Sequence, residues 1–192
     1  MKIRFLGVGA AFTTPAYYQS NMLITAPSGR HLLLDCGADA RFSLSEQLGA
    51  IGADLAPETC HRLVDAVFIS HLHSDHIGGL EWLAFSTYYD PQCPTPRMFG
   101  EARMLRELWS QSLRGGLYYN TGRTMSLDDY FRLEPQADNA RFIWEGLELR
   151  MVKARHIRCN DEGMFSHGLV ARAADGSGRA AWISTDALCD PA

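Results

Sequence analysis

The sequence predicts an α/β protein whose core is formed by two β-sheets, with helices packed outside them. Segments rich in β-branched and aromatic residues, typical of strands, occupy both ends of the chain, and segments with helical periodicity lie between them. Because a sheet must bury one face against another layer, strands that bracket a helical region favour a layered sandwich. The chain contains no internal repeat or low-complexity linker, so residues 1–192 are expected to form one domain.

The first half of the chain predicts a strand, a hairpin and a second, buried strand. "KIRFLGVG" at the N-terminus is a strand that ends in glycines, and "NMLITA-PSG-RHLLLDCG" has two apolar runs around a Pro-Ser-Gly break. "ARFSLSEQLGAIG" is typical of a short helix closed by glycine. "VDAVFIS", residues 64–70, has the β-branched and aromatic content of a buried strand.

The second half predicts two helices, an irregular insert and three strands. "GGLEWLAFSTYY" and "EARMLRELWSQSL" have helical patterns, and residues 97–134 are expected to leave the core as a helical and loop insert. From residue 141 the chain is strand-rich, in "RFIWEGLELRMVKA", "MFSHGLVARA" and "RAAWISTDA". The "DGSG" between the last two indicates a tight hairpin turn.

Composition excludes several classes of protein. The 192 residues carry a formal net charge of -4, so no global positive field attracts nucleic acid, although a local patch would remain compatible with it. No apolar run approaches the length of a membrane span, and the N-terminus does not resemble a signal peptide. The five cysteines are scattered without a C-x-x-C pair, which favours reduced thiols and a cytoplasmic location. A homodimer is compatible with these observations.

Residues 70–79, "SHLHSDHIGG", concentrate titratable side chains directly after the buried strand. Residues two apart in an extended segment point to the same side, so His71 and His73 are expected to point together. Asp75 and His76 follow where the chain turns into a helix. One histidine at a strand end is usually structural, but three with an aspartate in six positions indicate a metal site. Imidazole and carboxylate suit zinc first, with manganese or iron as alternatives.

The same segment, with its flanks, resembles the metallo-β-lactamase fold superfamily. "HLHSDH" matches the H-x-H-x-D-H pattern of that superfamily, and "FLGVGAAF", "LLLDCG" and "SHGLVARAADGSGRAAWISTDA" resemble its flanking segments. The resemblance covers nearly the whole chain and implies a four-layer αββα sandwich. The opening strand and "LLLDCG" are most similar to the branch of tRNA 3′-processing nucleases and phosphodiesterases, although "DCGADARFSL" departs from the nuclease pattern.

The resemblance implies a pair of divalent metal ions. By resemblance to the family's motif positions, the first ion would be bound by His71, His73 and His156. The second ion would be bound by Asp75 and His76, and Asp186 would bridge the two ions. His167 competes with His156; we favour His156 because it lies at a strand end, and His167 would then face substrate or bond a loop carbonyl. Asp35 is expected to support the ligands from behind. Taken alone, Asp186 would be interpreted as a turn or capping residue.

The chain departs from the superfamily at its end. The family continues past the bridging aspartate to a last histidine for the second metal, whereas this chain ends six residues after Asp186. We therefore expect a sandwich that lacks its C-terminal portion, either by truncation, which we favour, or naturally. A sheet without its closing strand would expose an edge.

Three functions are compatible with these residues. The first is a dinuclear phosphodiesterase, in which a metal-bridging hydroxide attacks a small or nucleotide-type phosphodiester and Asp75 orients it. The second is a hydrolase of thioesters, lactones or β-lactams. The third is a diiron oxygen or redox sensor, or a domain whose catalysis has lapsed. Aromatic side chains of the insert could stack on a base, but a small core of their own is the favoured interpretation.

Overall fold

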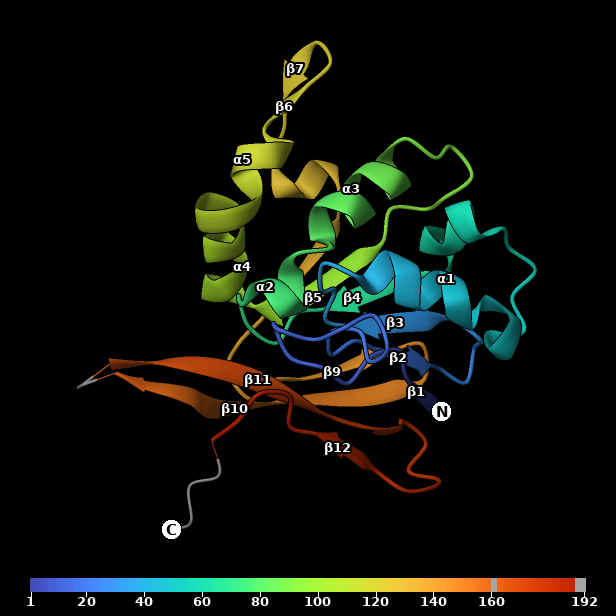
Figure 1. Ribbon diagram of the computed structural model, residues 1–192. Coiled ribbons are helices and arrows are strands. Elements are labelled where there is room, and N and C mark those ends of the chain that lie inside the picture. Colours follow the sequence, from blue (N-terminus) through green and yellow to red (C-terminus); the bar gives the residue numbers. More distant parts are fainter. Residues whose placement is uncertain (160–161, 189–192) are drawn as a thin grey trace.

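A six-stranded sheet lies at the centre of the computed structural model, which describes residues 1–159 and 162–188 (Figure 1). Its strands, in spatial order, are β1 (Lys2–Phe5), β2 (Met22–Thr25), β3 (His31–Leu34), β4 (Ala66–Phe68), β5 (Arg97–Glu101) and β8 (Arg132–Gln136). The pairs β1·β2 and β2·β3 are antiparallel, and the pairs from β3 to β8 are parallel. The predicted hairpin and the predicted buried strand are therefore neighbours in one sheet.

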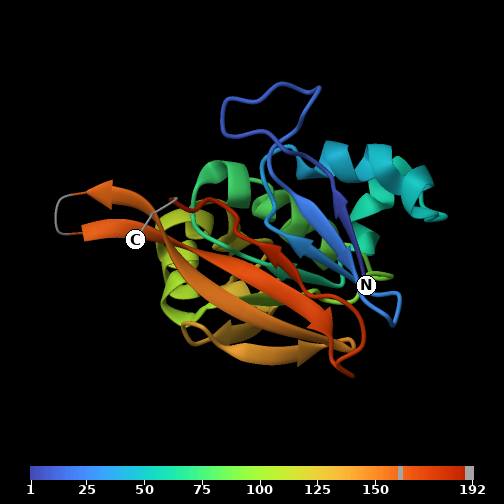
Figure 2. The ribbon, with the colours of Figure 1, turned by 90° about the horizontal axis from the view of Figure 1, so that it is seen from below.

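A second, antiparallel sheet of four strands packs below the first. Its order is β12 (Ala181–Ile183), β11 (Glu162–Ala173), β10 (Leu147–Cys159) and β9 (Arg141–Trp144). Figure 2 views this sheet from below and shows the long β10–β11 hairpin projecting past the rest of the molecule. The prediction of two sheets in the core is confirmed.

Helices cover the opposite face of the six-stranded sheet (Figure 1). They are α1 (Ala40–Ile51), the 3₁₀ turn η1 (Pro57–Leu63), α2 (Ser74–Ile77), α3 (Leu80–Tyr88), α4 (Ala102–Leu108), the π-helical η2 (Trp109–Leu113), α5 (Arg114–Leu117) and the 3₁₀ turn η3 (Leu127–Asp129). Among the described residues the order of layers is thus helices, sheet, sheet. In the same part of the chain, each helix falls short of the length or apolarity needed to span a membrane.

The alternation of side chains along the central strands divides the core in two. Leu33 and Val67 point to the helical side, whereas Leu32, Leu34 and Phe68 point to the second sheet. All five side chains are fully buried. Strands buried on both faces give continuous apolar runs, which explains why "LLL" and "VF" are not interrupted by polar residues.

The segment predicted as an insert begins and ends inside the sheet. Residues 97–101 and 132–136 are β5 and β8, so the part that leaves the sheet is residues 102–131. It includes the small hairpin of β6 (Tyr119–Asn120) and β7 (Arg123–Thr124), far from α2 in Figure 1. The insert packs on α3 through an aromatic side chain: the Tyr130 ring lies 5.3 Å from that of Tyr88 and 5.9 Å from that of Phe85. The corrected boundary follows from the sheet, because β5 and β8 complete its hydrogen bonding.

Candidate metal centre

The histidine cluster lies at the end of β4, where the chain leaves the sheet and enters α2. His73 has an extended backbone and directly precedes α2, while Asp75 and His76 lie in the first turn of that helix. Gly79 is required here because a Cβ atom at this position would lie 2.3 Å from the carbonyl oxygen of Gly37. This close approach brings the loop after β3 against the cluster.

Four side chains direct one ligand atom each at a common point. His73 Nδ1 lies 3.1 Å from His71 Nε2 and 3.1 Å from His156 Nε2, and His156 Nε2 lies 3.6 Å from Asp186 Oδ2. A tetrahedral zinc ion with bonds of 2.0–2.1 Å would separate its ligand atoms by about 3.3 Å. One proton on His73 Nδ1 can satisfy only one of its two imidazole contacts, whereas a metal ion would satisfy all of them.

A second group of ligand atoms lies beside the first and shares Asp186 with it. His76 Nε2 is 3.6 Å from Asp75 Oδ2 and 3.6 Å from Asp186 Oδ2. His76 and Asp75 are buried, and His76 Nε2 has no hydrogen-bond partner among the described residues. A buried nitrogen without a partner, facing two carboxylates, fits a cation between them. The two groups are His71, His73, His156 and Asp186, and Asp75, His76 and Asp186.

Asp35 holds one histidine of each group in place from behind. Its Oδ1 accepts a hydrogen bond from Ser70 N at 2.8 Å, and its Oδ2 accepts from Ser70 Oγ at 2.7 Å and from His76 Nδ1 at 2.7 Å. Because the Ser70 hydroxyl donates to Asp35, it accepts from His71 Nδ1, 2.9 Å away. Both Nδ1 atoms therefore carry the proton, and both Nε2 atoms are free to bind a metal.

Asp35 has an unusual backbone for this task. Its φ is 61°, in the left-handed region that aspartate tolerates better than most residues other than glycine. The conformation follows the end of β3, where Asp35 N still bonds to the carbonyl oxygen of Phe68. Local strain at a functional site persists when surrounding contacts over-determine it, and Asp35 has three such contacts.

The charges of the cluster favour metal binding. Burial, aided by the neighbouring His76 and His73, lowers the pKa of His71 to about 3, so its imidazole is neutral. Burial also lowers the pKa of His76, but Asp186 and Asp35 outweigh burial and raise that pKa to about 10. His76 in turn lowers the pKa of Asp186 to about 2, against the effect of burial. The carboxylates thus favour positive charge at the position of His76 Nε2, which a metal ion would supply.

His156 reaches the cluster because β10 contains a bulge. The pairing of β10 with β11 shifts between Arg155 and Ile157, which leaves His156 as the extra residue. A bulge re-aims one side chain out of the regular alternation. His167 lies on β11 away from both ligand groups, with its Nε2 3.0 Å from Asp138 Oδ1. The geometry therefore places His156, and not His167, beside His71 and His73.

Asp186 is positioned by the strand that carries His167. Ser166 Oγ donates to the backbone oxygen of Asp186 at 2.5 Å, and Leu188 N donates to the oxygen of Arg155 at 2.7 Å. Thr185, just before Asp186, has a φ of 52°. These contacts bring the end of the chain back over β10 and β11 and turn the Asp186 carboxylate toward His76 and His156.

Sequence reasoning missed two residues that bind histidines in this part of the molecule. Ser70 links Asp35 to His71 by hydrogen-bonding to both through its hydroxyl group. The sequence marks it only by its position next to the first histidine. Asp138 binds His167 and Lys153, but it comes from the loop before β9 and no motif marks it. Cys36 and Cys159 contribute no atom to either ligand group; Cys36 is buried and Cys159 is exposed. Cys189 lies outside the described residues.

Comparison with known proteins identifies the family. A protein-family model described as "Anti-Pycsar protein Apyc1" matches residues 1–192. The chain belongs to the Apyc1 family. The Apyc1 protein of Paenibacillus xerothermodurans is 32% identical over 158 residues, and that of Bacillus phage vB_BsuM-Goe3 is 34% identical over 137 residues. These matches include 82% and 68% of this chain but only 58% and 46% of the relatives, so the chain spans about half the length of the curated relatives it matches.

Solved structures show the metallo-β-lactamase-like fold at low sequence identity. Yeast PDE1 superposes with a TM-score of 0.67 at 14% identity, covering 89% of this chain and 61% of that chain. The short form of human tRNase Z superposes with a TM-score of 0.63 at 19% identity, covering 99% and 72%. Zn(2+)-bound PqqB from Methylobacterium extorquens gives a TM-score of 0.65 at 16% identity, covering 89% and 61%. The predicted fold class is confirmed, and the Apyc1 family is a more specific assignment whose structural neighbours include tRNase Z and PDE1.

Proposed function

We propose that this chain carries the metal centre of a phosphodiesterase whose substrate is a cyclic nucleotide. The observation that carries the proposal is the pair of ligand groups that meet at Asp186. Membership of the Apyc1 family, whose members are named anti-Pycsar proteins, supports phosphodiester cleavage over the thioester and sensor alternatives. A cyclic nucleotide is a small phosphodiester, in line with the substrate class expected from the histidine motif.

The residues fit two divalent ions, with zinc as the first choice. His71, His73, His156 and Asp186 would hold one ion, and Asp75, His76 and Asp186 would hold the other. When bound, such a pair supplies Lewis acidity toward phosphoryl oxygens and lowers the pKa of a water molecule. The mixture of imidazole and carboxylate also accepts manganese or iron.

The chain's own side chains fix the Nδ1 proton on two of the histidines of the centre. Asp35 and Ser70 hold the protons of His71 and His76 on Nδ1, away from the centre. Asp75, buried and 3.6 Å from His76, is the carboxylate that we assign to orient the attacking water by accepting its hydrogen bond. A water molecule held in one orientation needs less reorganisation to reach the transition state.

The direct test uses the full-length natural protein, stripped with a chelator and reloaded with zinc or manganese. Cyclic nucleotides, a thioester and a β-lactam are offered to the metal-free and reloaded forms, and products are separated by chromatography. We expect ring opening of cyclic nucleotides by the reloaded form alone, and its loss in the Asp186→Asn variant. Hydrolysis of the thioester or lactam without hydrolysis of any phosphodiester would contradict the proposal.

A further inference from the structure

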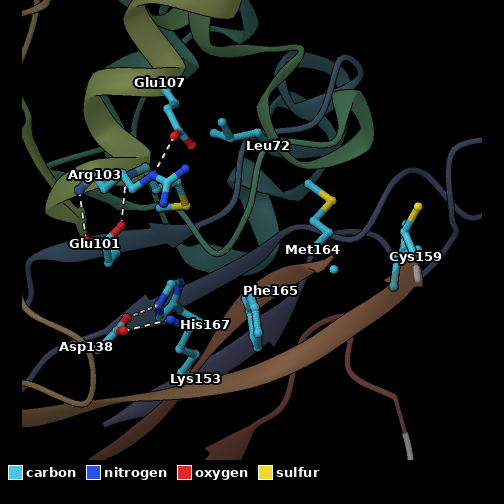
Figure 3. A pocket seen from close by; sticks show the side chains of 13 residues that line it. Leu72, Glu101, Arg103, Glu107, Asp138, Lys153, Cys159, Met164, Phe165 and His167 are labelled. Atoms are coloured by element: carbon cyan, nitrogen blue, oxygen red, sulfur yellow. Dashed lines mark hydrogen bonds and ion pairs between the residues drawn. The ribbon is translucent and has the colours of Figure 1, made fainter. Parts of the chain in front are cut away.

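A groove of about 730 Å³ opens between α4 and the β10–β11 hairpin, beside the candidate metal centre (Figure 3). Its volume lies in the range of small-molecule sites. Leu72, Met164 and Phe165 give it apolar walls, and Asp138, Lys153 and His167 form a polar cluster at its base. A mostly apolar cleft with a few convergent polar groups is the usual form of a site for a flat organic ligand.

The groove begins where the core between the two sheets ends. The cross-strand pairs Leu149↔Ala171 and Met151↔Leu169 lie on the inner face of the hairpin and are buried. The next two pairs on the same face are Lys153↔His167 and Arg155↔Phe165. The inner face therefore changes from apolar to polar at the point where the hairpin projects beyond the first sheet. Lys153, His167 and Phe165 of these pairs line the groove opposite α4.

The polar cluster has more hydrogen-bonding capacity than it uses. Asp138 binds His167 Nε2 at 3.0 Å through one oxygen and Lys153 Nζ at 2.8 Å through the other. His167 is only 4% exposed, yet its Nδ1 has no hydrogen-bond partner among the described residues. A buried nitrogen without a partner needs an explanation, and a ligand that supplies a hydrogen bond is one. Lys153 and Asp138 remain partly exposed, so they offer a donor and an acceptor side by side.

The charges along the groove do not suit a second phosphate. Glu101, Glu107 and Asp138 outnumber the two basic side chains, Arg103 and Lys153. Both basic groups are already paired: Arg103 Nε lies 2.7 Å from Glu107, and Lys153 lies 2.8 Å from Asp138. A groove with an excess of negative charge disfavours an anion and suits a neutral heterocycle with polar edges.

The walls of the groove are continuous with the segments that carry the metal ligands. Leu72 lies between His71 and His73 in the chain, and Ile157, another lining residue, follows His156. The backbone N–H of His167 donates to the oxygen of Ser70 at 2.9 Å. The groove thus borders segments that carry metal ligands, and we expect a molecule bound at the metal centre through its phosphodiester to place a neutral group in it.

We propose that the groove binds the base of the nucleotide, with Phe165 against the ring face and Lys153, Asp138 and His167 at its polar edge. Lys153 Nζ lies 4.6 Å from the centroid of the Phe165 ring in the structure, so the base would take the place of this ammonium group on the ring. This inference rests on the proposed function, because the phosphodiester of the same nucleotide would lie at the metal centre. Base stacking on an aromatic side chain tolerates every base, whereas the donor and acceptor pair would select among them. The cluster of Lys153, Asp138 and His167 would then select among bases, in addition to covering the end of the core.

The test separates base binding from catalysis by using a substrate without a base. Full-length natural protein, reloaded with zinc, is given cyclic nucleotides with four different bases and 1-O-methylribose 3′,5′-cyclic phosphate. The variants are Phe165→Leu and Lys153→Met, on the groove, and Tyr119→Leu as a matched control. Tyr119 is an aromatic side chain, 79% exposed, on the β6–β7 hairpin away from the groove.

We expect both groove variants to raise KM for cyclic nucleotides about tenfold, with KM for the abasic substrate unchanged. Lys153→Met should also alter the ranking of the four bases, which a purely structural role would not do. Equal effects on both kinds of substrate, or no effect on either, would overturn the proposal, and Tyr119→Leu should change neither.

A second measurement keeps the groove testable if the proposed function fails and nothing is cleaved. Nucleosides are titrated into isotope-labelled protein, and the backbone amides of residues 163–167 are followed by NMR. Shifts in the wild type that are weakened in Phe165→Leu would support base binding without catalysis. An absence of shifts at millimolar nucleoside would refute the groove as a base site.

Discussion

Two of the histidine–carboxylate clusters in the described part of the chain handle buried charge in opposite ways. In the first, the candidate metal centre, imidazoles and carboxylates converge without a basic side chain in the ligand groups. In the second, His61 Nε2 lies 2.9 Å from Asp90, and Arg62 binds the same carboxylate through Nε at 2.5 Å and through a terminal nitrogen at 3.1 Å. Asp90 is thus neutralised by the protein itself.

The difference teaches how a ligand site is distinguished from an ion pair. The His61–Asp90–Arg62 cluster fastens η1 to the loop after α3, and its carboxylate needs no further positive charge. The candidate metal centre has three imidazole nitrogens within reach of one point and two carboxylates beside them. Both clusters combine a buried histidine with a nearby aspartate. Only in the candidate metal centre do several ligand atoms converge without an arginine that neutralises the carboxylates.

The sharpest test of this comparison replaces one histidine from each cluster. His71→Ala removes a ligand whose Nε2 faces His73, so we expect the protein to lose the ion of the first group and nearly all phosphodiesterase activity. His61→Ala should keep both ions and lose about 1–3 kcal/mol of unfolding free energy. Metal per chain by elemental analysis and chemical denaturation measure the two effects. Equal metal loss in both variants would refute the distinction.

The two histidines of the β10–β11 hairpin provide the next test. His156→Ala should weaken metal binding strongly, because His156 lies on the bulge and faces His73. His167→Gln should leave metal content unchanged, since His167 bonds to Asp138 and belongs to neither ligand group. Competition with a chromogenic chelator gives both affinities. The reverse order of affinities would restore His167 as the ligand.

Removing the support behind the ligands should have a smaller effect. Asp35→Asn loses the charge that holds the protons of His71 and His76 on Nδ1, and we expect metal affinity to fall about 10–100-fold. Ser70→Ala breaks only the path to His71 and should lie at the lower end of that range. Asp90→Asn is the matched control in the second cluster. Calorimetric titration of zinc into the metal-free proteins would contradict this reasoning if Asp90→Asn weakened binding as much as Asp35→Asn.

The smallest expected effect concerns acid stability in the second cluster. The hydrogen bond from Arg62, followed by those from Gln92 and His61, holds the pKa of Asp90 well below its usual range. A carboxylate with a lowered folded-state pKa adds stability above its unfolded pKa of about 3.9, and that stability is lost as pH falls through the folded pKa. The unfolding free energy of the metal-free wild type should therefore fall more steeply below about pH 4 than that of Asp90→Asn. Parallel pH curves for the two proteins would show that Asp90 makes no such contribution.

Much of the fold was predictable because local patterns and layer packing agree. The apolar runs at residues 32–34 and 66–68 are buried in the structure, as their lack of polar residues indicates. The boundary of the insert was not predictable, because β5 and β8 are short parallel strands whose partners lie far away in the chain. Parallel strands pair across long connections, so the local sequence pattern does not indicate which strands are partners.

The sequence by itself determined the chemistry of the candidate centre, since residues 70–76 carry four of its ligand atoms within one turn of strand and helix. These four side chains lie on an extended segment and on the first turn of a helix. In both, the direction of a side chain follows from local backbone geometry, so their spacing in the sequence was enough to predict that they converge. Only the tertiary structure decided between His156 and His167, which lie on paired strands of one hairpin. A one-residue bulge directs His156 to the centre, while the regular alternation of β11 directs His167 to Asp138. Where a side chain points depends on strand register, and register is decided by pairing with another strand.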